Sequence, residues 1–110
     1  MSRRRIRGKR VTGVDHHRAL RRRAHRHARK GDLRKAAIAL RQLAALGGEA
    51  RYWVALGAVL SRGNKHSEAI DAWKQGLWLF KQSGANGRAA TVAKLILELD
   101  PSDRTALKAA

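Results

Sequence analysis

Residues 50–83 read ARYWVALGAVLSRGNKHSEAIDAWKQGLWLFKQS, and this stretch decides the fold. It contains two runs of apolar or small residues at helical spacing, separated by the polar break Gly63-Asn64. The recurring positions are Trp53, Leu56, Gly57 and Leu60 in the first run, and Ala69, Ile70, Trp73, Leu77 and Phe80 in the second. Each run predicts a helix with one apolar face, so each helix needs a neighbour to cover that face.

The same pattern continues on both sides of this stretch. Breaks at Gly31, Gly47-Gly48, Ser83-Gly84 and Asp100-Pro101 divide the chain into segments of helical length. Helices are expected over residues 32–46, 49–62, 67–82 and 88–99, with another before Gly31 and the start of a sixth after Pro101. Asp32 is a suitable N-cap because its short side chain can accept a hydrogen bond from a backbone amide of the first turn. The sequence predicts an all-α protein of five to six helices.

The series from Trp53 to Gly76 resembles the tetratricopeptide repeat, a helical hairpin that stacks on its neighbours. Residues 17–48 are similar to an earlier unit, with Leu20 where the family has Trp and Arg23 at a usually apolar position. A later half-unit ends at Pro101. Trp73 fits both the second helix of the unit over residues 50–83 and the first helix of the later unit, and even helix spacing favours the former. The resemblance implies a short stack of antiparallel helical hairpins that acts as a binding scaffold.

Positive charge is concentrated near the N-terminus of the chain. The 110 residues carry a net charge of +17, with 25 Lys and Arg against 8 Asp and Glu. Most of this excess lies within residues 1–35. Such a charge attracts polyanions, including nucleic acid, anionic lipid and acidic protein segments.

Residues 1–15 have few apolar side chains and are expected to form a flexible basic arm, followed by a helical domain over residues 16–110. The arm has no aromatic residues for base stacking, so its contacts with nucleic acid would be to phosphates. A solubilising or sorting role, or a contact with an acidic partner, is the alternative. The candidate polyanion-binding residues of the arm and the first helix are Arg3, Arg4, Arg5, Arg7, Lys9, Arg10, Arg22 and Arg26.

The tetratricopeptide resemblance implies a second binding surface, since the first helix of each unit lines an inner groove in that family. The matching positions are Arg18, Arg21, His25 and Arg29 in the earlier unit, and Arg51, Val54, Ala58 and Arg62 in the clearer one. This groove would suit an acidic peptide with one or two apolar residues, or a chain terminus whose carboxylate is bound by Arg. Trp78 lies about 140° around the helix from Trp73. It either packs beneath the next helix or forms an exposed aromatic anchor for a partner.

Other function classes find little support in the sequence. His16, His17, His25 and His27 lack the i, i+4 spacing of a helical zinc site, so no metal or other cofactor is expected. No nucleophile elbow or phosphate-binding glycine loop is present, which argues against an enzyme. The chain has no cysteine and no apolar stretch of about 20 residues, so a cytoplasmic protein without membrane insertion is expected.

Two functional hypotheses remain open at this stage. The first is a non-catalytic adaptor that binds an acidic protein segment in a basic groove. The alternative is a protein that binds RNA or DNA through phosphate contacts from residues 1–35. The apolar side of residues 104–110 could cap the domain or pair with a second copy of the chain.

Overall fold

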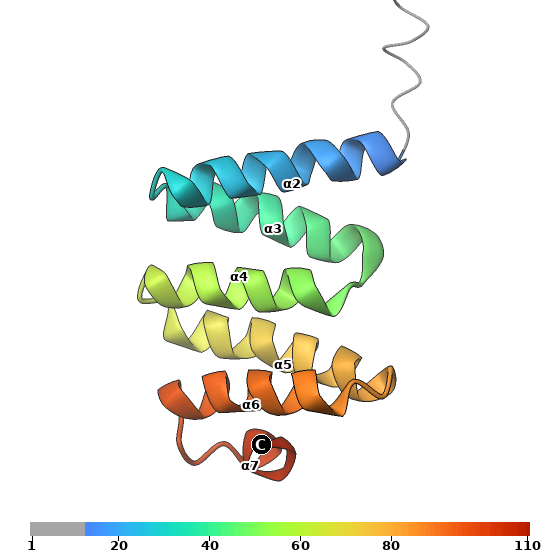
Figure 1. The fold of residues 1–110 in the computed structure, drawn as a ribbon. Helices are drawn as coiled ribbons and strands as arrows, with labels where there is room; N and C mark the ends of the chain where they lie inside the picture. The colour runs from blue at the N-terminus through green and yellow to red at the C-terminus, as the bar shows by residue number, and fades with distance from the viewer. Residues whose placement is uncertain (1–12) are drawn as a thin grey trace, which may run out of the picture.

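The computed structural model describes residues 13–110 and confirms the prediction of an all-helical stack. Six α-helices follow one another, and no strand occurs within these residues: α2 (Gly13–Arg29), α3 (Leu33–Gly47), α4 (Ala50–Arg62), α5 (His66–Gln82), α6 (Asn86–Leu99) and α7 (Arg104–Ala109). Helices α2 to α6 run in alternately opposite directions and lie one beside the next, whereas α7 lies crosswise at the end of the stack opposite α2 (Figure 1). This arrangement is the stack of antiparallel hairpins predicted from the apolar periodicity.

The N-terminal boundary differs from the prediction. Helix α2 begins at Gly13, so Gly13, Val14 and Asp15 belong to a helix and not to an arm that ends at residue 15. Asp15 lies in the first turn, where a negative charge favours a helix because it interacts with the positive end of the helix dipole. The rest of the predicted arm, with its six Lys and Arg residues, lies outside the described residues.

Three of the connections use the same turn. Gly31, Asn64 and Gly84 all have a positive φ, of 80°, 62° and 78°. In each turn the next residue donates its backbone amide to a carbonyl five residues earlier, as in the 2.9 Å bond from Lys65 N to Leu60 O. This is the pattern of a Schellman motif, which ends a helix by satisfying its last carbonyl groups. Repetition of one turn makes the hairpins similar in shape.

Helix α3 begins as predicted, because the Asp32 carboxylate accepts a hydrogen bond of 3.2 Å from the Lys35 amide. Asp103 caps α7 in the same way, with a bond of 2.9 Å from the Ala106 amide. Both carboxylates satisfy amides that have no partner within their own helix.

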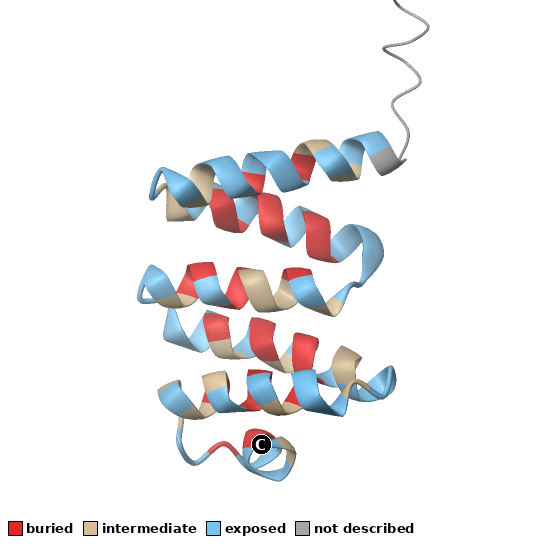
Figure 2. Ribbon diagram, in the orientation of Figure 1, coloured by how far each residue is buried: buried red, intermediate tan, exposed pale blue. Residues whose placement is uncertain are grey.

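The core runs through the middle of the stack as a continuous series of apolar layers (Figure 2). Five large side chains are almost completely inaccessible to solvent, namely Leu20, Leu43, Leu56, Leu77 and Ile96. Ten other buried positions are alanine, namely Ala24, Ala36, Ala37, Ala39, Ala44, Ala69, Ala72, Ala89, Ala93 and Ala106. Alanine at these positions allows helix axes to approach closely.

Trp73 locks α5 onto α4, as predicted for the second helix of a hairpin. Its indole Nε1 donates a hydrogen bond of 3.0 Å to the Val54 carbonyl, and its ring lies against Gly57. Leu56 is buried as expected and Tyr52 is also buried, whereas Trp53 and Phe80 are only partly buried. Gly76 faces Val54 and the Ala50 carbonyl so closely that a Cβ atom there would lie 2.9 Å from Val54 Cγ2. Both glycines therefore serve as sites of close helix contact.

Ion pairs link the second helices of successive hairpins along the outside of the stack. Arg41 of α3 pairs with Glu68 of α5 at 2.8 Å, and Lys74 of α5 pairs with Asp103 at the start of α7 at 2.6 Å. Arg41 and Glu68 are about half exposed, so their pair contributes little to stability. Asp103 is buried, so its pair with Lys74 anchors α7 more firmly.

Candidate functional site

A groove of about 550 Å³ lies between α2 and α4, with α3 behind it. Its lining is mostly apolar and comes from all three helices. The apolar lining residues are Ala24, Ala28, Leu40, Leu43, Ala55, Ala58 and Val59. The polar side chains that line it are Arg21, His25, Arg51 and Tyr52. No Asp or Glu is among its lining residues, so the groove is suited to a ligand with negative charge.

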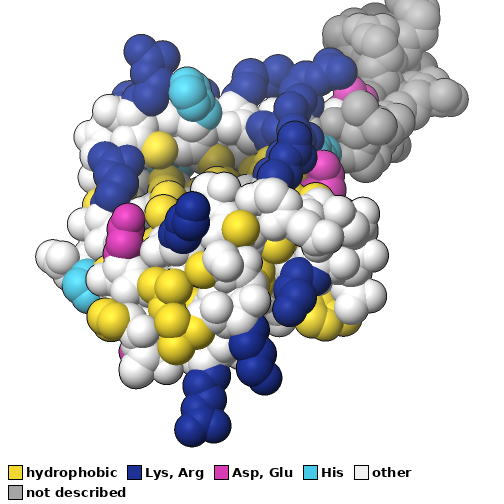
Figure 3. Space-filling view, turned by 60° about the horizontal axis from the view of Figure 1, so that its bottom comes forward, with side chains coloured by type: hydrophobic (Ala, Val, Ile, Leu, Met, Phe, Trp, Pro, Cys, Tyr) yellow, Lys and Arg dark blue, Asp and Glu magenta, His cyan; other side chains and the backbone are white. Residues whose placement is uncertain are grey.

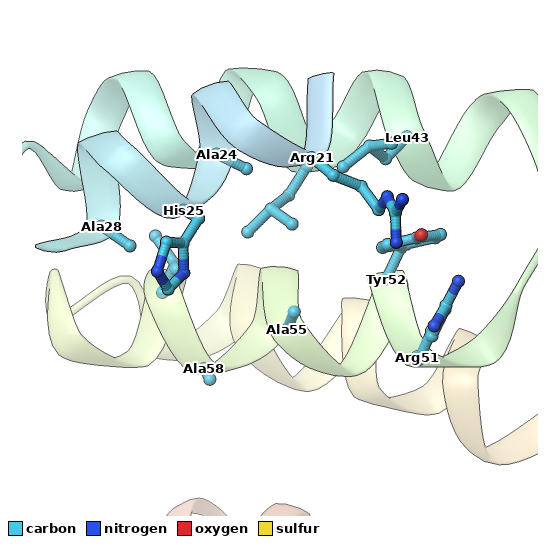
Figure 4. Close-up of a pocket in the computed structure, with 11 residues that line it drawn as sticks. Arg21, Ala24, His25, Ala28, Leu43, Arg51, Tyr52, Ala55 and Ala58 are labelled. Atoms are coloured by element: carbon cyan, nitrogen blue, oxygen red, sulfur yellow. The ribbon is translucent and has the colours of Figure 1, made fainter. Parts of the chain in front are cut away.

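The polar side chains lie toward the two ends of the groove. Figure 4 shows Arg21 of α2 and Arg51 of α4 on either side of Tyr52 at one end, with His25 toward the other end. Ala24 and Ala55 face each other between them (Figure 4). An elongated ligand with a negative group near one end and a small apolar group in the middle would match this arrangement.

Arg51 is held in place by contacts on its own side of the groove. Its guanidinium carbon lies 4.8 Å from the centre of the Tyr52 ring, and its Nε lies 3.2 Å from a Glu49 carboxylate oxygen. The same carboxylate is 3.6 Å from His17 Nε2, and the His17 ring meets the Tyr52 ring edge to face at 5.2 Å. Arg21, in contrast, forms no ion pair with an acidic residue of the described chain. It is therefore the cation available to a ligand.

Tyr52 contributes a polar atom without a hydrogen bond. Its side chain is 6% exposed, and its hydroxyl group is buried with no partner among the described residues. A buried hydroxyl that lacks a partner costs about 1 to 3 kcal/mol. Its position beside the two arginines makes this end of the groove the more polar one.

The structure brings together only part of the predicted groove. Arg21, His25, Arg51 and Ala58 line it, whereas Arg18, Arg29 and Arg62 do not. Arg18 and Arg29 are exposed on α2 on the same side as Arg22 and Arg26. Val54 also lies outside the groove, because its side chain faces Gly76 of α5.

Trp78 is 57% exposed, so the interpretation that it packs beneath the next helix is wrong. It does not line the groove either. The helix that follows, α6, packs against α5 but leaves Trp78 in solvent.

Several groove residues were not anticipated from the sequence. Leu40 and Leu43 are buried in the core, and they also line the groove. Tyr52 is buried as well, and its ring forms part of the groove wall. The sequence carries no signal for this double role, because it depends on the distance between α2 and α4.

The other predicted features can be placed as follows. Within residues 13–110, no three His, Asp or Glu side chains lie together in a way that could hold a metal ion. None of the described helices combines the length and the apolar character needed to span a membrane.

At the far end of the stack, Ala106 of α7 is fully buried against α6, whereas Leu107 is 55% exposed. The apolar side of α7 therefore caps the stack in part.

Comparison of this chain with models of known protein families and with curated protein sequences finds no match. The resemblance to tetratricopeptide repeats therefore remains a prediction from the residues themselves. What the structure adds is a stack of antiparallel hairpins with a basic groove on one side.

Proposed function

We propose that this protein is a non-catalytic helical adaptor that binds an acidic segment of another protein in the groove between α2 and α4. The observation that carries the proposal is the convergence of Arg21 and Arg51 at one end of an apolar groove without any acidic lining residue. A carboxylate at that end would form charge-assisted hydrogen bonds with guanidinium groups, which recognise carboxylates in a planar, two-pronged manner.

The apolar part of the groove supports a peptide more than a small anion. Small side chains line its middle, so there is room for one apolar side chain of a ligand next to the charged end. An acidic segment that carries a single leucine or similar residue would fill this space and keep its charges at the arginines. A ligand of this kind is also consistent with the resemblance to tetratricopeptide repeats.

The proposal is tested by the affinity of the protein for a fluorescent peptide with glutamates on both sides of one leucine. Replacing Arg21 by Gln is expected to weaken binding about tenfold or more, since a hydrogen bond to a charged group is lost. Arg104→Gln removes the same charge from an exposed site on α7, at the other end of the stack, and is expected to have little effect. Equal losses in the two variants would indicate a response to net charge alone and would contradict a specific groove.

A pair of substitutions at Ala55 separates charge from shape. Ala55→Glu and Ala55→Lys introduce side chains of similar length at the point where Ala55 faces the groove (Figure 4). If an acidic segment occupies the groove, the Glu variant should bind the peptide much more weakly than the Lys variant. Equal affinities would show that the peptide binds elsewhere.

A further inference from the structure

The outer face of α2 carries a second basic surface that does not belong to the groove. Arg18, Arg22, Arg26 and Arg29 are exposed, and we call them the α2 arginine stripe. At about 100° per residue they fall within an arc of about 80°, and they extend along about 16 Å of the helix. The buried residues Leu20 and Ala24 lie on the opposite side. The stripe therefore points away from the rest of the stack.

None of the six ion pairs found among the described residues includes an arginine of the stripe. Figure 3 shows Lys and Arg side chains crowded over the α2 end of the molecule, whereas they are scattered over the remainder of this view. Four exposed guanidinium groups in a row attract an anionic partner with a repeated charge.

We propose that the α2 arginine stripe binds the phosphate backbone of double-helical DNA, with α2 lying in the major groove. One strand of DNA carries a charge about every 3.4 Å along the duplex axis, so a helix in the major groove has a row of phosphates on each side of it. Arg23, which does not line the groove, extends the basic surface on one side to an arc of about 140°. A helix with arginines over so wide an arc can contact the phosphates on both walls of the groove.

The composition of this face selects DNA in duplex form. Helix α2 contains no Phe, Tyr or Trp, the large aromatic side chains on which the bases of a single strand stack. It contains no Asn or Gln, the side chains that read adenine, so the base contacts expected in the major groove are those of Arg to guanine. The major groove of B-DNA is about 12 Å wide and admits an α-helix, whereas that of A-form RNA is too narrow.

The experiment measures the affinity of the full chain for a labelled DNA duplex of mixed sequence over a range of salt concentrations. The double variant Arg22→Gln/Arg26→Gln keeps helix propensity, because Arg and Gln are similar helix formers. Loss of two phosphate contacts should lower the salt slope by about 1.8 and weaken binding about 60-fold at 0.1 M salt. The matched control, Arg88→Gln/Lys94→Gln on α6, also loses two positive charges and should keep the parent slope.

Three results would overturn the proposal. The first is an equal loss of affinity in the two double variants, which would show that affinity depends on the net charge of the protein and not on the position of the arginines. The second is equal or tighter binding of duplex RNA or of a single strand of the same length. The third is unchanged reactivity of guanine N7, which lies in the major groove, toward dimethyl sulfate in the complex. The double variant Arg22→Gln/Arg26→Gln keeps Arg21 and Arg51, so its affinity for the acidic peptide should be unchanged. Peptide binding therefore tests the groove independently of DNA binding.

Discussion

At the scale of single residues, Gly57 shows how one missing side chain permits a close contact. A Cβ atom at this position would overlap the Trp73 indole, which is itself fixed by its hydrogen bond to the Val54 carbonyl. Glycine costs about 1 kcal/mol relative to alanine inside a helix. The contact with Trp73 explains why alanine is not used at this point of α4.

Gly57→Ala is therefore expected to lower the free energy of unfolding by roughly 1 to 3 kcal/mol, because overpacking outweighs the gain in helix propensity. Urea denaturation followed by tryptophan fluorescence measures the change. Gly87→Ala is the matched control, since a Cβ atom at this position of α6 meets nothing within 4 Å. If the two variants were equally stable, the contact between α4 and Trp73 would not be as close as described.

Tyr52 supplies a second prediction at the residue scale. Because its hydroxyl is buried without a partner among the described residues, Tyr52→Phe removes an unsatisfied polar group while it keeps the ring. We expect the free energy of unfolding to rise by about 1 kcal/mol. Thermal unfolding and urea denaturation measure this quantity, and a loss of stability would show that the hydroxyl makes a stabilising hydrogen bond.

At the scale of helices, the short α7 depends on one carboxylate with two functions. Asp103 caps the helix and also pairs with Lys74 of α5. The hydrogen bond between the two side chains, supported by the amide of Ala106, holds the pKa of Asp103 below its ordinary value of 3.8. The same bond raises the pKa of Lys74 above 10.5. The cap and the ion pair can be separated, because asparagine caps a helix but carries no charge.

The pH dependence of α7 follows from the directions of these two shifts. The stability contributed by the lowered pKa of Asp103 is present above pH 3.8 and is lost as the pH falls through the folded-state value. The contribution of the raised pKa of Lys74 is present below pH 10.5 and is lost as the pH rises beyond it. We therefore expect hydrogen exchange of the Leu107 and Ala110 amides to be slowest, relative to an unstructured peptide, between these limits.

Substitutions at Asp103 test this account. Asp103→Asn should keep the cap but lose the protection that depends on the ion pair. In this variant the protection of the Leu107 and Ala110 amides should no longer decrease in the acid range where the parent protein loses it. Asp103→Ala should lose both the cap and the ion pair. Loss of the cap should lower the free energy that protects these amides from exchange by about 0.5 to 2 kcal/mol more. Identical exchange in the Asn variant and the parent would contradict a role for the ion pair.

At the scale of the whole molecule, each helix makes its main contacts with the helices before and after it in the sequence. In such a stack, stability is close to a sum of terms for each unit and for each interface. A substitution at one end of the stack should therefore change the stability of the neighbouring helices alone. A substitution in the middle should change the stability of both halves of the stack.

This difference is measurable by hydrogen exchange along the chain. Asp103→Ala should increase exchange in α7 and the neighbouring α6, and leave the amides of α2 and α3 protected. Gly57→Ala lies at the contact between α4 and α5, so it should lower protection in α3 and α6 as well. A uniform loss of protection in both variants would show that the stack unfolds as a single cooperative unit.

The sequence by itself determined the helices and their order. Apolar residues every three or four positions, Gly31, Gly48 and Gly84 at the breaks, and Asp32 as a cap are local features, and they predicted the ends of α3, α4 and α5 to within one residue. The start of α2 was placed too late, because its first turn lacks the apolar periodicity on which the prediction relied.

The tertiary structure alone decided which arginines act together. The sequence grouped Arg18, Arg21 and Arg29 as one groove, but the angle at which α2 packs on α3 turns Arg21 toward α4 and leaves the other two on the outer face. It also placed Leu43 and Tyr52 in the groove and joined Lys74 to Asp103. These pairings depend on distances between helices, which are set by the packing of buried side chains and have no counterpart in the local pattern of residues.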